Sequence, residues 1–153
     1  MKLERILVPM DFSDNGIAAA RSAADLARLS GGKLWLMHSP EIPSGISLDT
    51  LINPAPGQPG IPLREYFARK AEVDFADLRE ELGDLVADVI IRPERKPAGE
   101  IVKLADDLEV DLIVMGTHGR KGFQRLLMGS VTETVLRETS RPVMVVRAPS
   151  AEG

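Results

Sequence analysis

The chain has 153 residues, a formal net charge of −4 and no cysteine. A length of this order fits one domain, and a folded chain of about 150 residues buries roughly 68–70% of its unfolded surface, so it needs no disulfide or structural metal. The missing cysteines exclude a disulfide framework, a zinc ribbon, an iron–sulfur site and a thiol nucleophile, and the acidic balance argues against a nucleic-acid partner.

Charged residues interrupt every apolar run before the roughly 18 residues that a membrane-spanning helix requires. The chain passes from Lys2 directly into an apolar segment, without the apolar core and cleavage site of a signal peptide. We therefore expect no membrane partner and a cytoplasmic location.

The hydrophobic pattern alternates between two kinds of segment along the chain. Short apolar runs, typical of strands buried on both faces, predict strands at residues 3–9, 33–38, 86–91, 111–115 and 143–146. Apolar residues at helical spacing predict helices at residues 14–29, 63–82, 97–108 and 130–139. Ser13 is the expected N-cap of the first helix, and Gly31 and Gly32 are expected to end it.

Two segments depart from this alternation. Residues 39–62 contain six prolines and predict a mobile surface loop without a long regular element. Residues 148–153 predict a frayed tail, so the domain is expected to span residues 1–147.

Five strands alternating with four helices predict an α/β fold, Rossmann-like, with a single open parallel sheet and helices on both faces. Ligands of such sheets bind outside the carboxyl ends of the strands, at the point where the strand order reverses. The loops after the first, second and fourth predicted strands are therefore the candidate ligand-binding segments.

The loop after the fourth predicted strand has the strongest chemical signal. We expect Gly116 and Gly119 to allow positive φ and the close approach of a ligand. Gly129 and Ser130 open a helix whose first amides suit a phosphate chain. The loop also concentrates positive charge, on Arg120, Lys121 and Arg125.

A structural interpretation of the same loop stays open. Residues 130–133 read Ser-Val-Thr-Glu, the pattern of a capping box that satisfies helix-end amides without a ligand. The loop is not a Walker A motif, because no Gly-Lys-Ser/Thr follows the glycines, and it does not match the dinucleotide pattern G-x-G-x-x-G.

Three blocks of sequence make the chain recognisable. Gly116 and Gly119, then nine residues, then Gly129 and Ser130 form a spacing that resembles the nucleotide-binding signature of the universal stress protein family. The blocks at residues 6–13, 111–119 and 141–146 are also similar to that family. The resemblance implies a sheet in the order 3-2-1-4-5, a homodimer, and ATP held at the loops after the first and fourth strands.

The same resemblance assigns individual residues to the two halves of a nucleotide site. Pro9 and Asp11 match the adenosine-side loop, with Met10 between them, and Ser39 stands where an apolar wall for the base is expected. The ribose and phosphate side matches Met115, Gly116, His118, Gly119, Arg120, Gly129, Ser130 and Val131. Any Mg²⁺ would arrive with the triphosphate.

Individual residues have alternative interpretations. Asp11 contacts a ligand or joins Ser13 in the cap of the first helix. His38 and His118 lack a carboxylate at ligand spacing and are interpreted as polar strand-end or loop residues, not as metal ligands. Residues 143–146 would form an edge strand, and we expect this strand to pair with its own copy in a two-fold dimer.

No activated nucleophile or acid–base group emerges from the sequence. The sequence therefore predicts a regulatory ATP-binding module of the cytoplasmic stress response, not an enzyme, with at most slow ATP hydrolysis. The alternatives are a nucleotide-free dimeric interaction protein of the stress response and an ATP-using enzyme that acts on a substrate under the 39–62 loop. No motif identifies a protein partner.

Overall fold

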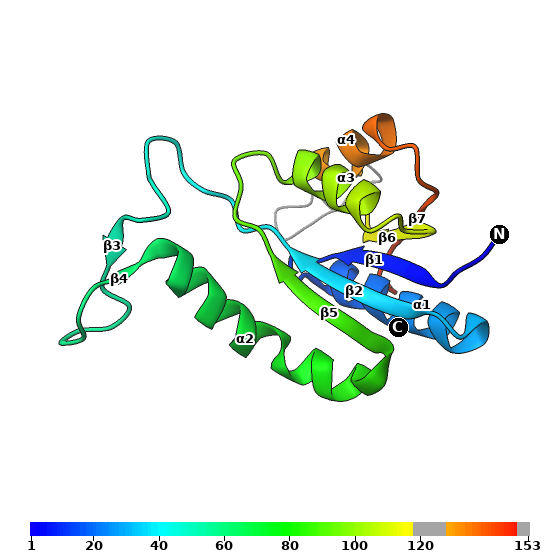
Figure 1. Cartoon of the computed structure of the whole chain (residues 1–153), viewed down its shortest axis with the longest axis horizontal. Helices are drawn as coiled ribbons and strands as arrows, with labels where there is room; N and C mark the ends of the chain where they lie inside the picture. Colours follow the sequence, from blue (N-terminus) through cyan, green and yellow to red (C-terminus); the bar gives the residue numbers. More distant parts are fainter. Residues whose placement is uncertain (118–127, 150–153) are drawn as a thin grey trace.

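The computed structural model describes residues 1–117 and 128–149 (Figure 1). Five parallel strands form one sheet in the order β5-β2-β1-β6-β7. Their bounds are Arg5–Pro9 for β1, Lys33–His38 for β2, Val86–Ile91 for β5, Leu112–Gly116 for β6 and Val143–Val146 for β7. Counted within this sheet alone the order is 3-2-1-4-5, which confirms the predicted topology.

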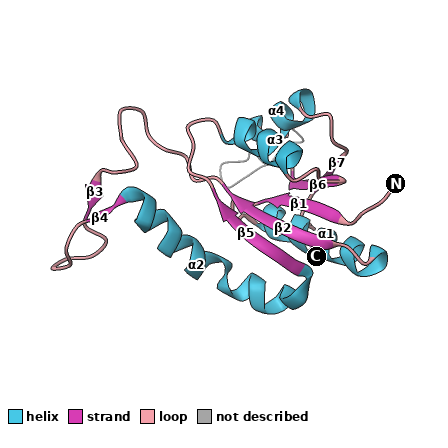
Figure 2. Cartoon of the chain, in the orientation of Figure 1, coloured by secondary structure: helices cyan, strands magenta, loops and turns pink. Residues whose placement is uncertain are grey.

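Helices cover both faces of the sheet, as Figure 2 shows. The helices are α1 (Asp14–Ser30), α2 (Leu63–Leu82), α3 (Pro97–Asp107) and α4 (Ser130–Glu138), with a 3₁₀ turn at Gly83–Leu85. One core cluster joins α1 and α2 to side chains such as Ile6 and Val8, and the other joins α3 and α4 to side chains such as Leu7 and Ile113. Alternate residues of each strand thus point into opposite cores, as the continuous apolar runs predict.

Helix α1 shows how the sequence defines an element. Ser13 is its N-cap, with the hydroxyl accepting a hydrogen bond from the backbone N–H of Gly16, and Gly31 follows its last residue at φ +76°. Its buried face consists largely of alanine, which lets the helix pack closely on the sheet. Both predicted ends of this helix are confirmed to within one residue.

Asp111 connects the beginnings of two neighbouring strands, β1 and β6. It was expected to be the first residue of the fourth strand. The strand begins at Leu112 instead, and the Asp111 carboxylate accepts hydrogen bonds from the backbone N–H groups of Glu4, at 2.8 Å, and Arg5, at 3.0 Å. Because a carboxylate bound to two amides fixes both chain segments, Asp111 aligns the first residues of β1 with β6.

Residues 39–62 contain a short hairpin. Two-residue strands β3 (Leu51–Ile52) and β4 (Ile61–Pro62) pair antiparallel, beyond the start of α2 and away from the main sheet (Figure 1). The backbone N–H of Leu63 donates to the carbonyl of Thr50, which ties this hairpin to the first turn of α2. These two-residue strands are too short to contradict the prediction that no long regular element forms here, and the mobility of the loop stays a prediction.

The tail also begins in an ordered way. The backbone N–H of Ala148 donates to Oδ1 of Asn15, at 2.7 Å, and so fixes the chain after β7 to the first turn of α1. Fraying of the tail stays a prediction, and residues 150–153 lie outside the described part of the chain.

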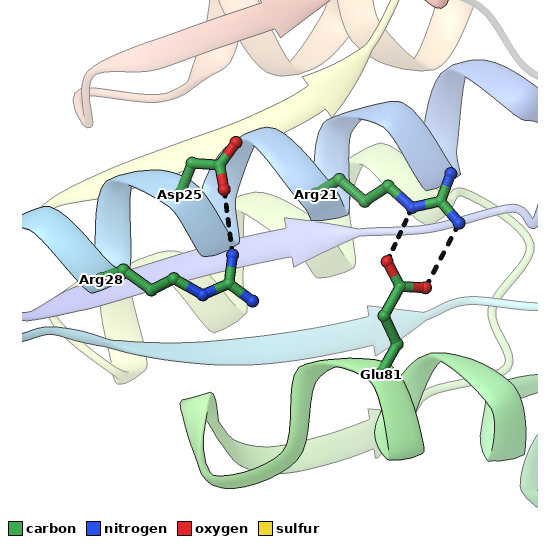
Figure 3. A network of polar contacts seen from close by, with 4 residues as sticks. All are labelled: Arg21, Asp25, Arg28 and Glu81. Carbon is green, nitrogen blue, oxygen red and sulfur yellow. Dashed lines mark hydrogen bonds and ion pairs between the residues drawn. The ribbon is translucent and has the colours of Figure 1, made fainter.

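Helices α1 and α2 are joined by an exposed ion pair (Figure 3). Arg21 donates from Nε and Nη2 to the two carboxylate oxygens of Glu81, at 2.8 and 3.2 Å, and these bonds lower the pKa of Glu81. Arg28 pairs with Asp25 along the same helix. Exposed pairs contribute little to stability, so the buried side chains of α2 hold it against the sheet.

Among the described helices, none is both long enough and apolar enough to cross a membrane.

Candidate functional site

The strand order reverses between β1 and β6. Strand β1 connects through α1 to β2 on one side, and β6 connects towards α4 and β7 on the other side. The carboxyl ends of β1 and β6 therefore border the crevice where open α/β sheets bind their ligands. The chain leaves the sheet at this crevice after residues 9 and 116, which begin the two loops that the resemblance assigns to ATP.

The loop after β1 is fixed by its own backbone and side chains. Pro9 and Met10 are buried, and the N–H of Met10 extends the ladder by donating to the carbonyl of Met37, at 2.7 Å. Asp11 Oδ1 accepts hydrogen bonds from the N–H and the hydroxyl of Ser13, at 3.0 and 2.6 Å. The cap interpretation of Asp11 is thus confirmed. Its other carboxylate oxygen makes no hydrogen bond within the described residues, so its contact with a ligand stays a prediction.

Ser39 follows β2 at the same edge of the sheet. Its hydroxyl donates to the carbonyl of Arg92, at 2.7 Å, and thereby joins the chain after β2 to the chain after β5. The polar group of Ser39 is therefore engaged within the protein. This hydrogen bond lets a serine stand where the family resemblance implies an apolar residue.

Gly116 does not have the positive φ that was expected, but close packing explains the absence of a side chain here. Its φ is not positive, whereas a Cβ atom at this position would lie 2.8 Å from the carbonyl carbon of Asn15 and 2.9 Å from its Cβ. The first turn of α1 therefore packs directly on the end of β6. Neighbouring Met115 is buried beneath it.

The start of α4 also differs from expectation. Gly129 is the N-cap, at φ −61° and ψ 157°, so no left-handed conformation is needed, and no side chain caps the helix. The predicted capping box, with Ser130 as the cap, is therefore wrong: Ser130 is the exposed first helical residue. Within the described residues no side chain caps the first amides of α4, which lie at the positive end of the helix dipole.

Three backbone and side-chain contacts hold this helix start against β6. The N–H of Gly129 donates to the carbonyl of Thr117, at 2.7 Å, and the buried hydroxyl of Thr132 donates to the carbonyl of Gly116, at 2.9 Å. The N–H of Thr117 donates in turn to the carbonyl of Val146 in β7. The helix start and the strand end therefore form one rigid junction.

A groove lies between α3 and α4. It encloses about 280 Å³ and is lined by Lys96, Pro97, Ala98, Gly99, Ser130, Val131, Thr134 and Glu138. A larger groove, of about 560 Å³, lies between α2 and β5 and includes none of the predicted site residues. The smaller groove includes Ser130 and Val131, two of the predicted site residues.

Thr117, next to the junction, has a buried hydroxyl oxygen without a hydrogen-bond partner in the described residues. The residue is 9% exposed. Three residues that were predicted to contribute to the site, His118, Gly119 and Arg120, lie outside the described residues.

Residues 1–117 and 128–149 contain no cluster of three or more His, Asp or Glu side chains that could hold a metal ion.

His38 is a structural feature of this edge that the sequence did not reveal. Its Nδ1 lies 2.7 Å from the carbonyl oxygen of Met10. Burial lowers the pKa of His38, and the hydrogen bond to Met10 and the charges of Asp74 and Asp11 oppose this shift, while Lys70 adds to it. The folded protein therefore favours the neutral ring.

This shift predicts a dependence of stability on pH. An unfolded histidine titrates near pH 6.5, so the stability that neutral His38 contributes is present above about that pH and is lost as the pH falls through the lower pKa of the folded state. We expect the free energy of unfolding to fall less between about pH 7.5 and pH 5.5 in His38→Asn than in the unmodified protein. Urea titrations at the two pH values measure the difference. Equal losses in both proteins would show that His38 does not titrate differently on folding.

Comparisons with known proteins agree with this architecture. Residues 2–147 match the model of the Universal stress protein family. The chain is 30% identical over 155 residues to Universal stress protein MJ0577 of Methanocaldococcus jannaschii, covering 94% of each chain. The structure of that protein was published as a structure-based assignment of biochemical function. It superposes with a TM-score of 0.73 and 26% identity, over 99% of this chain and 100% of that one.

Two further structures share the fold at lower identity. A universal stress protein in complex with cAMP superposes with a TM-score of 0.66 and 20% identity, over 97% of this chain and 100% of that one. The universal stress protein of Archaeoglobus fulgidus in complex with dAMP superposes with a TM-score of 0.63 and 22% identity, over 95% and 99%. The family match over almost the whole length shows that this chain belongs to the universal stress protein family.

Proposed function

We propose that this protein is an ATP-binding regulatory module of the cytoplasmic stress response. The observation that carries the proposal is the start of α4, beside the crevice between β1 and β6, where the N-cap is a glycine and no side chain of the described residues caps the first amides. An uncapped helix start at the carboxyl edge of a parallel sheet suits the phosphates of a nucleotide.

The two halves of a nucleotide would meet different parts of the crevice. Pro9, Met10, Asp11 and Ser39 form the adenosine side, and Met115, Gly116, Gly129, Ser130 and Val131 form the ribose and phosphate side among the described residues. Related structures with cAMP and dAMP support an adenine nucleotide in this fold. The triphosphate would bring its own Mg²⁺. The junction of β6 with α4 would offer mainly glycines and backbone groups to the ligand.

The proposed role is binding, with at most slow ATP hydrolysis. The side chains that approach the crevice in the described structure are engaged in structure: Asp11 in a helix cap and Ser39 with a backbone carbonyl. A phosphoryl-transfer enzyme needs a group that positions the attacking nucleophile as well as a metal-holding acid. Regulation through the bound state therefore fits these residues better than catalysis.

Direct binding measurements test the proposal. Protein stripped of co-purified ligand is titrated calorimetrically with ATP and Mg²⁺, and we expect saturable binding. Gly129→Val should abolish it, because the side chain would stand over the first amides of α4 while the extended backbone at φ −61° accepts valine without strain. Circular dichroism and melting of the ligand-free variant verify that it folds.

A nucleotide-free interaction protein is the second candidate, and two observations favour it. The Asp11 carboxylate completes a helix cap, and Gly116 is required by the packing of Asn15, so neither residue needs a ligand to explain it. Unmodified protein that binds no ATP would leave this candidate standing.

We further propose that the protein is a homodimer through β7. This strand lies at the edge of the sheet, and all four of its residues are only partly buried. Unpaired backbone groups of an edge strand can pair antiparallel with those of a second copy about a two-fold axis.

Sedimentation of charge variants tests the dimer. Val145→Lys should shift the protein towards monomer, since a charge would be buried at the two-fold axis. Val73→Lys is the matched control, because Val73 is 76% exposed on α2 and lies outside β7. A monomer for the unmodified protein at micromolar concentration would refute the proposed dimer.

A further inference from the structure

The loop between β1 and α1 is held in a strained conformation. Phe12 has φ +64°, in the left-handed region that large side chains avoid. Such a conformation persists only where the surrounding structure over-determines it, and it is typical of ligand-binding segments. The contacts that hold Phe12 in place therefore set the shape of the whole loop, including its neighbour Asp11.

Two aromatic rings from different elements hold the Phe12 ring. The ring of Phe75, from α2, lies edge-on at a centroid distance of 4.6 Å, and the ring of His38, from β2, lies edge-on at 5.0 Å. Phe75 is 1% exposed, so it is a fixed part of the core between α2 and the sheet. Edge-to-face contacts of this kind favour one ring orientation over others.

His38 also fixes the backbone of the same loop. A carbonyl oxygen can only accept a hydrogen bond, so Nδ1 of His38 must carry the proton that it donates to the carbonyl of Met10. The N–H of Met10 is bound to the carbonyl of Met37. The N–H and the carbonyl of Met10 are therefore both hydrogen-bonded to β2. Met10 lies next to Asp11 in the chain, so these bonds also restrict the position of Asp11.

We infer that His38 and Phe75 are positioning residues for the nucleoside half of the site, acting through Met10 and Phe12 respectively. The inference rests on the proposed function and adds that α2 and β2, on the other side of the crevice from α4, determine affinity for the adenosine moiety. The phosphate half depends on the separate junction of β6 with α4 and is independent of these rings.

Two probes separate the halves of the site: AMP, which contains the nucleoside, and inorganic tripolyphosphate, which lacks it. His38→Phe keeps an aromatic ring but cannot donate to Met10, and we expect it to weaken AMP binding about tenfold, the effect of one lost hydrogen bond. Tripolyphosphate affinity should stay within about twofold of the unmodified protein. His38→Asn, whose amide can donate from nearly the same position as Nδ1, should recover most of the AMP affinity.

A pair of substitutions in α2 tests the role of the aromatic contact. Phe75→Leu removes the ring that holds Phe12 and should weaken AMP binding selectively. Phe67→Leu is the matched control, because its ring pairs with Tyr66 on the same helix and has no aromatic contact with the loop in the described structure. We expect Phe67→Leu to bind both probes as the unmodified protein does.

The outcomes distinguish the inference from the function on which it rests. Selective loss of AMP binding, with rescue by His38→Asn, supports positioning by these rings. Unchanged AMP binding in His38→Phe and Phe75→Leu, or an equal loss of AMP and tripolyphosphate binding, overturns the inference while the proposed function stands. Unmodified protein that binds neither probe overturns both.

Discussion

Addition of ATP at about 1 mM with Mg²⁺ should raise the melting temperature of ligand-stripped protein by roughly 5–11 °C. For a dissociation constant on the order of 10 μM, the linkage relation RT ln(1 + [L]/Kd) gives a stabilisation of about 2.7 kcal/mol. Each kcal/mol moves the melting temperature of a domain of this length by about 2–4 °C. Differential scanning fluorimetry measures the shift.

Melting-temperature shifts measured with AMP and with variants show how much each half of the crevice contributes to the ATP-dependent shift. AMP should give a smaller shift, because it leaves part of the α4 start at Ser130 unfilled. Asp11→Asn keeps an acceptor for the Ser13 cap but removes the charge, and it should reduce the AMP and ATP shifts alike. Gly129→Val should remove the ATP shift. No shift at millimolar ATP would identify the glycine-rich junction as structural and favour the nucleotide-free interaction protein.

The fold was predictable because its strands are short apolar runs, and β1, β2 and β6 are largely buried. Residues 34–37 and 143–146 are continuously apolar, and strands β2 and β7 contain these runs. Ser13 and Gly31 defined the ends of α1, since capping chemistry is local in sequence. Asp111 was misassigned because its partners, the amides of Glu4 and Arg5, lie at the other end of the chain.

The hairpin of β3 and β4 was missed for a related reason. Proline and glycine indicate turns correctly, but a two-residue strand is too short to show a hydrophobic period. Its existence depends on the contact between Leu63 and Thr50 at the start of α2. Pairing of such short segments follows from tertiary contacts and not from local preference.

The candidate site was predictable in position but not in detail. The order of elements placed Asp11, Gly116 and Gly129 at the same edge of the sheet, and the structure agrees. The positive φ expected at Gly116 was wrong, whereas the close approach of a ligand to this glycine stays a prediction. The contacts of His38 with Met10 and of Phe12 with Phe75 join separate elements, and no local pattern reports them.

The corrected interpretation of Gly116 leads to a prediction about the ligand-free protein. Gly116→Ala should lower its free energy of unfolding by about 1–3 kcal/mol, the usual cost of overpacking a filled site. The added Cβ would lie 2.8 Å from the carbonyl carbon of Asn15, so α1 would have to move away from β6. Urea denaturation of protein stripped of ligand measures this loss.

Gly99→Ala is the matched control for this substitution. A Cβ atom at Gly99 meets no heavy atom within 4 Å, and the residue lies in the first turn of α3 without a positive φ. Alanine there should raise stability by up to about 0.5–1 kcal/mol, because it restricts the unfolded chain and favours the helix. If both variants unfold with the same free energy as the unmodified protein, the packing of Asn15 does not explain Gly116. The glycine would then be required only when a ligand is bound, and its substitution would reduce the ATP-dependent shift without affecting the ligand-free protein.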